Sequence, residues 1–305
     1  MENKHAYLII SHNEFDILEK QLILLDDYRN DIYIHIDKKV KDFDFDYYKD
    51  IVKKSKLYYV KRLDIRWGDF SLVQCELILL KAAVKEQYKY YHLISGIDLP
   101  LKTNDEIHDF FNNKDGLEFI HFGTEQQAIN IRSRVSRYHF MRWCRTRNKY
   151  INYITSKINI ILDAIQHKTN FQRKWDENIK LQYGTQWFSI TNDLAKYVIS
   201  KEDWINKYFR YTSCSDEHFL QTIVYNSKFM DNLYKKEMNN DFTGCMRYID
   251  WKRGRPYIFR KEDFQELVNS DRIFARKFSS KVDNEVINNI FDYLVNKKNI
   301  NNNIS

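Results

Sequence analysis

Two neighbouring acids are the residues of this sequence best suited to acid–base chemistry. Asp216 and Glu217 lie in the stretch Ser213–His218, directly before the apolar pattern of a helix over 219–226. A carboxylate placed at a cleft can take the proton from a hydroxyl group as a general base. On spacing alone, acids in a first helical turn are more often caps that bind free backbone N–H groups. Both interpretations of this pair stay open at the level of the residues.

A second group of acids must be weighed as a metal site. Asp42, Asp44 and Asp46 alternate with phenylalanines before a short helical pattern. A hard cation needs oxygen atoms that converge on a shaped turn, and no strand leads into this stretch. We therefore expect the phenylalanines to pack inward and the acids to begin a helix. The four cysteines stand far apart without CxxC spacing, which predicts reduced thiols and no zinc site.

The elements that would position such residues are organised around 89–102. Tyr90–Ile94 is an aromatic and branched run typical of a buried strand, and Ser95-Gly96 ends it. Pro100 prevents a helix from beginning at once. Ligands of open α/β sheets bind at the carboxyl ends of the strands. This places Gly96 and Asp98 at the edge of the sheet where a ligand would lie.

The N-terminal part predicts a βαβ unit and hence a parallel sheet. Ala6–Ile10 and Ile32–Ile36 are β-branched runs, and apolar residues over 15–25 recur between them at helical spacing. Parallel strands end at the same edge of a sheet, so the polar residues that follow these runs should meet near Gly96. They are Ser11, His12 and Asp37.

The remaining patterns complete one α/β domain over 1–305. Further strands are expected at 57–60, at 117–122 and after the turn at Gly184, with helices over 71–83 and 219–226. A content of only 7 Gly and 2 Pro leaves no room for a flexible linker. Trp67-Gly68 precedes the helix over 71–83, where free N–H groups could face an anion and the indole could stack on a ligand.

Positive charge is concentrated in one segment. The chain carries a net charge of +7, but 132–175 alone holds eleven Lys and Arg against one acid, Asp163, which gives +10. The rest of the chain has 38 basic and 41 acidic residues, or −3. Isoleucines at helical spacing over 151–165 predict an amphipathic helix with cationic flanks. Such a helix could pack on the sheet, on a second subunit or on an anionic membrane surface.

The patterns near the N-terminus and the hydropathy favour a cytoplasmic protein. No hydrophobic run approaches the length of a membrane span, and the first residues show no signal-peptide pattern. Peripheral contact with the inner face of the plasma membrane is the option left by the basic segment. A basic nucleic-acid-binding protein is the alternative class, but no RNA- or DNA-binding motif is present, so no nucleic acid partner is expected.

Nine stretches, in this order, resemble the core-2/I-branching enzymes of glycosyltransferase family 14, which also includes peptide O-xylosyltransferases. They cover nearly the whole chain except 132–179, where Arg137-Tyr138 alone is similar. The lumenal anchor and disulfide cysteines of the animal members are absent, so we expect a bacterial member. The stretches are Ala6–His12, His35–Lys39, Trp67-Gly68 with Val73-Gln74, Leu93–Thr103, Gly184–Thr191, Ser215–His218, Arg247–Trp251, Gly254–Phe259 with Asp263, and Phe274–Phe278 with Asp283.

The resemblance implies a GT-A fold, a Rossmann-like mixed sheet flanked by helices, with 132–180 as a basic, divergent helical insertion. It implies inverting, metal-independent transfer from a UDP-sugar, without a cofactor. The family's general base corresponds to Glu217, and the lysine that stabilises the departing diphosphate corresponds to Lys277. The partner arginine falls at Arg253 or Arg255, of which Arg255 is preferred. Because Glu217 and Lys277 are retained, an inactive glycan-binding relative is disfavoured.

The resemblance also assigns the remaining site residues. The residues expected to bind the nucleotide and diphosphate are Ser11, His12, Asp37, Trp67 and Gly68, beside Arg255 and Lys277. Those expected to contact the donor or acceptor sugar are Gly96, Asp98, Gln186, Trp187, Asp216, Trp251, Arg137 and Tyr138. N-Acetylglucosamine is the first choice of donor sugar, with galactose, glucose or xylose as alternatives. The expected acceptor is a glycan or lipid-linked glycan in the synthesis of a surface polysaccharide.

Overall fold

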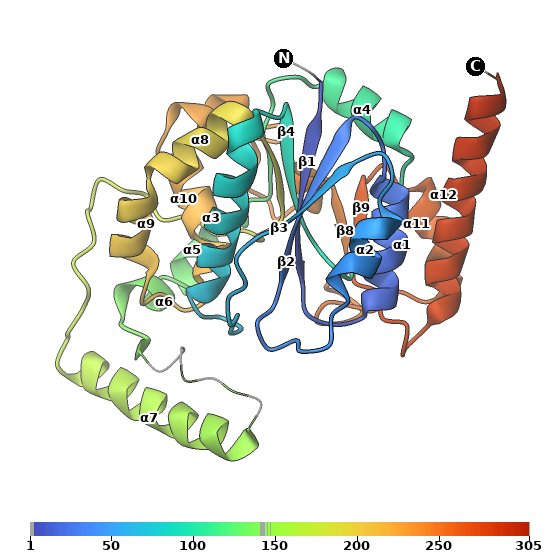
Figure 1. The fold of residues 1–305 in the computed structure, drawn as a ribbon. Helices are drawn as coiled ribbons and strands as arrows, with labels where there is room; N and C mark the ends of the chain where they lie inside the picture. The colour runs from blue at the N-terminus through green and yellow to red at the C-terminus, as the bar shows by residue number, and fades with distance from the viewer. Residues whose placement is uncertain (1–2, 141–143, 145, 147, 305) are drawn as a thin grey trace.

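The structure is a computed structural model and describes residues 3–140, 144, 146 and 148–304. Its main sheet has six strands in the order β3-β2-β1-β4-β7-β6 (Figure 1). Along the chain these are β1 His5–Ser11, β2 Asn30–Ile36, β3 Lys56–Tyr59, β4 Tyr90–Ser95, β6 Phe119–Ile120 and β7 Phe188–Thr191. The first four are parallel, whereas β7 runs antiparallel to β4 and β6 antiparallel to β7. The predicted α/β class with a mixed sheet is confirmed.

Helices cover both faces of this sheet, which explains why its central strands are apolar (Figure 1). Every residue of β1 and β2 is buried. The helices that pack on one face are α1 Phe15–Leu25, α2 Phe45–Ile51 and α4 Asn104–Asn112. Those on the other face are α3 Ser71–Ala83, α8 Asn192–Ser200, α9 Glu202–Phe209 and α10 Phe219–Tyr225. The helices predicted over 71–83 and 219–226 are among them.

A second, three-stranded sheet, which the sequence did not predict, follows the end of β4. Its order is β5-β9-β8, with β5 at Leu99–Pro100, β8 at Arg247–Ile249 and β9 at Phe274–Arg276. Strands of two or three residues are too short to show an alternating pattern. With α1, the helices α11 Phe264–Asn269 and α12 Asn284–Ile304 enclose a separate apolar core beside this sheet.

Shorter helical segments connect these elements. They are η1 Val84–Glu86, α5 Glu125–Asn130, η3 Ser215–Glu217, η4 Lys228–Asn232, η5 Phe242–Cys245 and η6 Lys261–Asp263. The strand expected over 117–122 is shorter than predicted, since only β6 pairs with β7. Its neighbour Glu118 instead bonds through its backbone to Asn232 and Tyr234, on the opposite side from the sheet.

The basic segment contains α6 Ser133–Ser136 and α7 Lys149–Lys168, and α7 includes the helix expected over 151–165. In Figure 1, α7 lies apart from the body, at the end of the molecule opposite the N-terminus. Its isoleucines are exposed to solvent, so of the three alternatives the structure does not show the one in which they pack on the sheet. Among the described residues, no helix combines the length and apolar character needed to cross a membrane. Arg145 and Arg147 lie outside the described residues.

One buried guanidinium group joins the two sheets. Arg247, at the start of β8, is only 1% exposed and stacks on the Phe274 ring of β9, 4.6 Å from its centre. Its Nη2 donates to the Phe188 carbonyl of β7 at 2.7 Å and to the Leu93 carbonyl of β4 at 3.2 Å. Its Nη1 donates to the carbonyl of Cys245 and to the Ser189 hydroxyl. Bonds to several carbonyls offset the cost of burying this cation.

We expect Arg247→Leu to lower the free energy of unfolding by about 3 kcal/mol or more, because it leaves buried carbonyl groups without donors. Urea unfolding followed by circular dichroism measures this change. The matched control is Arg210→Leu at an exposed helix end, which should change the same quantity by less than about 0.5 kcal/mol. Equal effects of the two substitutions would show that Arg247 does not hold the sheets together.

Candidate active site

The ends of three parallel strands bring together the polar residues predicted for one edge of the sheet. The backbone N–H of Asp37 donates to the Ser11 carbonyl at 3.0 Å, and that of Gly96 donates to the Ile10 carbonyl at 2.9 Å. A Cβ atom at Gly96 would lie 2.3 Å from the Ser11 hydroxyl oxygen, so only glycine fits this approach. Ser11 and Asp37 are almost fully buried, whereas His12 is exposed. The predicted meeting of these residues is found.

Asp98, two residues after Gly96, is paired with a cation that the sequence analysis missed. Its carboxylate accepts from the backbone N–H and the hydroxyl of Ser95 and lies 3.4 Å from Nε of Arg276. Burial raises the pKa of Asp98, and the Arg276 charge opposes this rise. The Arg276 guanidinium in turn covers the Trp187 ring at 4.1 Å. Trp187, expected in a sugar pocket, is thus buried beneath Arg276.

The turn that carries Asp216 and Glu217 is fixed by backbone contacts with two other predicted stretches. The N–H of Cys214 donates to the Gly68 carbonyl at 3.0 Å, next to Trp67, whose side chain is 64% exposed. The N–H of Gly184 donates to the Glu217 carbonyl at 2.9 Å. A Cβ at Gly184 would lie 2.0 Å from a backbone oxygen, which explains the glycine. Residues from two distant stretches therefore converge on the turn that carries Glu217.

The carboxylate of Glu217 points at a cation rather than capping a helix. Its Oε2 accepts from Nη1 of Arg134 at 2.8 Å, and both side chains are about one-third exposed, at 31% and 34%. Burial raises the pKa of Glu217 above its ordinary value, and the Arg134 charge opposes this rise. An accessible carboxylate with a raised pKa is suited to accept a proton.

Two further carboxyl groups lie in the interior beside this turn. Burial raises the pKa of Asp216 to about 7, and the neighbouring Glu217 charge adds to this effect. Glu76 of α3 is fully buried, and neither of its carboxyl oxygens has a hydrogen-bond partner. Burial raises the pKa of Glu76 well above its usual range, with Asp216 acting in the same direction.

The cations predicted to bind the diphosphate differ in whether they pair with acidic side chains of the protein. Arg253 contacts the carboxylates of Asp250, Asp263 and Glu266 and lies over the Tyr257 ring. Arg255 is exposed, and Lys277 is partly buried at the end of β9. Within the described part of the chain, neither Arg255 nor Lys277 pairs with an acid. Neither cation is therefore held by an acid that would compete with an anionic ligand.

The loop after β8 lies beside Lys277. The N–H of Phe259 donates to the Lys277 carbonyl at 3.2 Å, and the N–H of Phe278 donates to the Ile97 carbonyl at 3.1 Å, next to Asp98. Trp251, in the same loop, has a side chain that is 52% exposed. Gln186 is half-buried, and its Nε2 has no partner. These contacts place Lys277 at the predicted edge of the sheet.

Arg137 and Tyr138, expected near the acceptor, hold α7 on the body. Nη1 of Arg137 donates to both carboxylate oxygens of Asp163 at 2.8 Å. The backbone of Tyr138 exchanges hydrogen bonds with the Gln166 side chain, and its ring stacks on Phe140. Both residues therefore have structural partners that the resemblance did not suggest.

The aspartates at 42–46 behave as the start of a helix. The Asp44 side chain accepts from the N–H of Tyr47 at 3.0 Å as the cap of α2, and Phe43 is buried. Asp42 and Asp46 point to solvent. Across the described ranges, no three His, Cys, Asp or Glu side chains are placed to share a metal ion. None of the four cysteines, all of which lie within the described residues, forms a disulfide.

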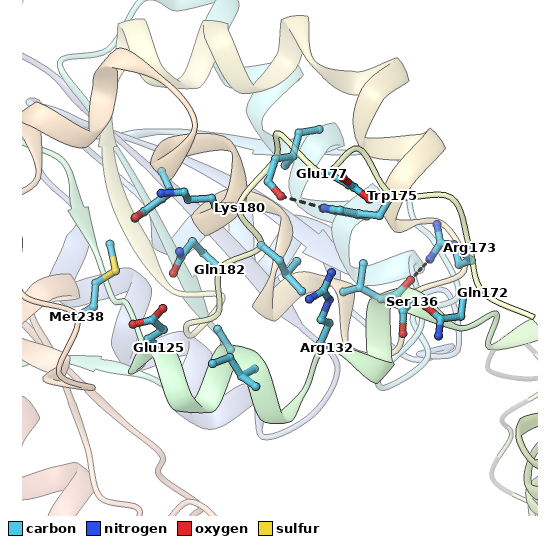
Figure 2. A pocket seen from close by; sticks show the side chains of 16 residues that line it. Glu125, Arg132, Ser136, Gln172, Arg173, Trp175, Glu177, Lys180, Gln182 and Met238 are labelled. Atoms are coloured by element: carbon cyan, nitrogen blue, oxygen red, sulfur yellow. Dashed lines mark hydrogen bonds between the residues drawn. The ribbon is translucent and has the colours of Figure 1, made fainter. Parts of the chain in front are cut away.

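A cavity of about 760 Å³ lies between α5 and the segment 172–182, and its walls include neighbours of the Glu217 turn (Figure 2). Val135 and Ser136, which follow Arg134, form part of its wall. Gln182 forms another part, and its carbonyl accepts from Nδ1 of His218, the residue after Glu217. Figure 2 shows Arg132 and Gln182 projecting into the space between α5 and the segment 172–182. The wall mixes charged and apolar groups, which suits a polar ligand larger than water.

Sequence reasoning missed Arg134, Arg276 and Glu76 as members of this site. Arg134 was noted only as one cation of the basic segment, and its place near Glu217 results from a contact between distant stretches. Arg276 precedes Lys277 in the run Phe274–Phe278, so the sequence already showed it next to a predicted site residue. Glu76 interrupts the apolar pattern of α3, and a charged residue at a buried helical position is the signal that could have revealed it.

We expect Arg134→Gln to raise the pKa of Glu217 further, because it removes the cation that favours the ionised carboxylate. NMR titration of protein with ¹³C-labelled glutamate measures this pKa. Arg137→Gln is the matched control, since its partner is Asp163. If the pKa of Glu217 is the same in Arg134→Gln as in the unaltered protein, the ion pair does not set its protonation.

Comparison with known proteins gives the family. The family model described as Core-2/I-Branching enzyme matches residues 5–270. Three curated relatives are xylosyltransferase 1 of Rattus norvegicus (24% identity over 285 residues, 86% of this chain and 32% of the relative), xylosyltransferase 2 of Rattus norvegicus (23% over 312 residues, 92% and 32%) and xylosyltransferase sqv-6 of Caenorhabditis briggsae (24% over 278 residues, 84% and 32%). This chain thus spans about a third of the length of these relatives.

A solved structure, apo mouse xyloside xylosyltransferase 1, aligns at 12% identity over 89% of this chain and 97% of that chain. Its TM-score is 0.35, an overlap too loose to establish a common fold. The family match stands independently of it, because it covers most of the chain and includes the Glu217 turn, Trp251 and Arg255. On that match, the protein belongs to the core-2/I-branching enzyme family.

Proposed function

We propose that this protein is an inverting glycosyltransferase that moves a sugar from a UDP-sugar to a hydroxyl group of a glycan acceptor. The observation that carries the proposal is the carboxylate of Glu217, which is accessible, bonded to Arg134 and fixed in a turn between Gly68 and Gly184. Membership of the family and the xylosyltransferase names of three relatives support the reaction class.

The proposed reaction is a direct displacement at the anomeric carbon. Glu217 takes the proton from the acceptor hydroxyl while its oxygen forms a bond to that carbon. The bond from the carbon to the diphosphate oxygen breaks on the opposite face, and its electron pair leaves with UDP. The sugar therefore changes configuration, and the proton ends on Glu217.

The leaving group needs positive charge as the second bond breaks. We assign this task to Lys277 and Arg255, which pair with no acid among the described residues, rather than to Arg253, which contacts three carboxylates. Lys277 lies beside the segment that carries Asp98, at the edge where ligands of α/β sheets bind. With these cations in place the transfer is proposed to need no divalent metal, because the exposed aspartates at 42–46 do not converge.

The nucleotide is proposed to lie against the ends of β1 and β2, at Ser11, His12 and Asp37, within a GT-A arrangement. N-Acetylglucosamine remains the first choice of donor sugar, and the names of the relatives make xylose its main competitor. A thermal-shift panel of UDP-N-acetylglucosamine, UDP-xylose, UDP-glucose and UDP-galactose would rank them, since a ligand that binds the folded state raises the melting temperature.

The acceptor is proposed to approach Glu217 from the side of Arg134. The cavity of about 760 Å³ beside this residue and the exposed ring of Trp251 are the two features that suit a glycan. Sugars present apolar C–H faces that stack on aromatic rings and hydroxyl groups that bond to charged side chains. A saccharide of a surface polysaccharide, free or lipid-linked, is the proposed acceptor class.

We expect Glu217→Gln to lower turnover roughly a hundredfold or more while UDP affinity stays unchanged, since the amide cannot act as a base but can still accept from Arg134. Radiolabelled transfer from the best donor measures turnover, and calorimetry measures UDP binding. The matched control is Glu237→Gln at an exposed loop position, which should leave both unchanged. Near-normal turnover of Glu217→Gln would move the base to Asp216 or Asp98.

We expect activity to survive treatment with EDTA, because Lys277 and Arg255 supply the charge that a metal ion would otherwise provide. The measurement compares initial rates before and after chelation, and again after addition of Mn²⁺ or Mg²⁺. If chelation abolishes activity and either ion restores it, Asp42–Asp46 would be the metal site. The role proposed for Lys277 would then be wrong.

A further inference from the structure

The outward side of α7 carries a row of apolar side chains that no described residue covers. Five isoleucines form a stripe along this helix at a spacing of three and four residues, which places them on one face. The stripe consists of Ile151, Ile154, Ile158, Ile161 and Ile165, with exposures between 38% and 59%. Tyr150 and Tyr153 extend it, at 82% and 65% exposure. Such an uncovered apolar face indicates a binding surface.

The charges of α7 are divided between its two sides. Lys157 follows Ile154 by three residues and Lys168 follows Ile165 by three, so both cations lie along the isoleucine stripe. The one acid of the helix, Asp163, lies on the side of the body, where Arg137 binds both of its oxygens. Gln166, which bonds to Tyr138, lies on that side too. Along its described length the outward side therefore combines isoleucines with cations and carries no acid.

We propose that the isoleucine stripe of α7, with Lys157 and Lys168, docks the protein on an anionic lipid surface. An amphipathic helix of this kind lies in the membrane interface, with its apolar side among the acyl chains and its lysines reaching the headgroups. The 20 residues of α7 lie apart from the body, so the whole stripe can reach a flat surface (Figure 1). This docking is a separate property from the proposed sugar transfer.

Charge favours lipid over the other occupants of such a face. A second copy of the chain would bring the same +10 segment, and the two would repel each other. A nucleic acid would use the cations but gain nothing from five isoleucines. An anionic bilayer satisfies both kinds of side chain at once.

The position of α7 suits such docking. β1 runs from the N-terminal end of the molecule toward the end where α7 lies (Figure 1). The ends of the parallel strands, with Ser11, Asp37 and Gly96, therefore face the same end of the molecule as α7. A protein docked through α7 would hold its candidate active site close to the lipid surface.

The test is co-sedimentation of the full chain with vesicles of phosphatidylcholine plus phosphatidylglycerol, and with phosphatidylcholine alone. We expect binding to the anionic vesicles at low salt, with loss at high salt because exposed charges are screened. Lys157→Glu with Lys168→Glu should weaken binding by at least about 25-fold, since each lysine near an anionic leaflet changes the binding constant about fivefold. Lys235→Glu with Lys236→Glu, at an exposed loop, is the matched control and should have little effect.

The apolar contribution is tested by Ile154→Gln with Ile161→Gln, which should also reduce vesicle binding, against Ile129→Gln as an exposed isoleucine elsewhere. All four variants of this test change exposed side chains, and an unchanged melting temperature checks the fold. Absence of binding to anionic vesicles at low salt would overturn the proposal. Equal binding to uncharged vesicles, or a dimer in sedimentation velocity that Ile154→Gln with Ile161→Gln dissociates, would also overturn it. Oligonucleotide binding that is unchanged in the Ile154→Gln, Ile161→Gln variant would overturn the proposal as well.

Discussion

The guanidinium group of Arg247 lies where the main sheet meets the small one, and it is bonded to carbonyls of both β4 and β7. A buried cation without such partners would be too costly to keep, so β8 is held in one position relative to the main sheet. The loop that follows β8 carries Trp251 and Arg255, and the parallel neighbour β9 leads into Lys277. The placement of β8 and its neighbour β9 against the main sheet, and with it the position of Lys277, therefore depends on Arg247.

The Glu217 turn shows how neighbouring acids can differ in protonation. Glu217 is accessible and faces Arg134, whereas Asp216 and Glu76 are buried and have oxygens without partners. Three nearby carboxylates would repel each other if all were ionised. Burial raises the pKa of both interior groups, and Glu217 is the one of these three acids whose side chain is about one-third exposed to solvent. It is therefore the carboxylate of the turn that a substrate could reach.

Much of this site could be predicted from the sequence because its signals are local. Apolar runs that end in polar residues predicted β1, β2 and β4, and they also predicted that Ser11, Asp37 and Gly96 lie at the strand ends. The pairing of Asp98 with Arg276 and of Glu217 with Arg134 could not be predicted, since each joins residues far apart in the chain. The small sheet was missed because its strands have no periodicity to detect. Arg137 matches a position of the family, but the resemblance did not indicate that its side chain binds Asp163.

The separation of α7 from the body bears on how this family could diversify. The contacts that attach it are few and lie on one side, chiefly through Arg137 and Tyr138. Substitutions on its other side break no packing and so carry little stability cost. The proposed lipid-binding side of α7 and the proposed active site are therefore physically separate parts of one chain, so substitutions could alter either one and leave the other intact.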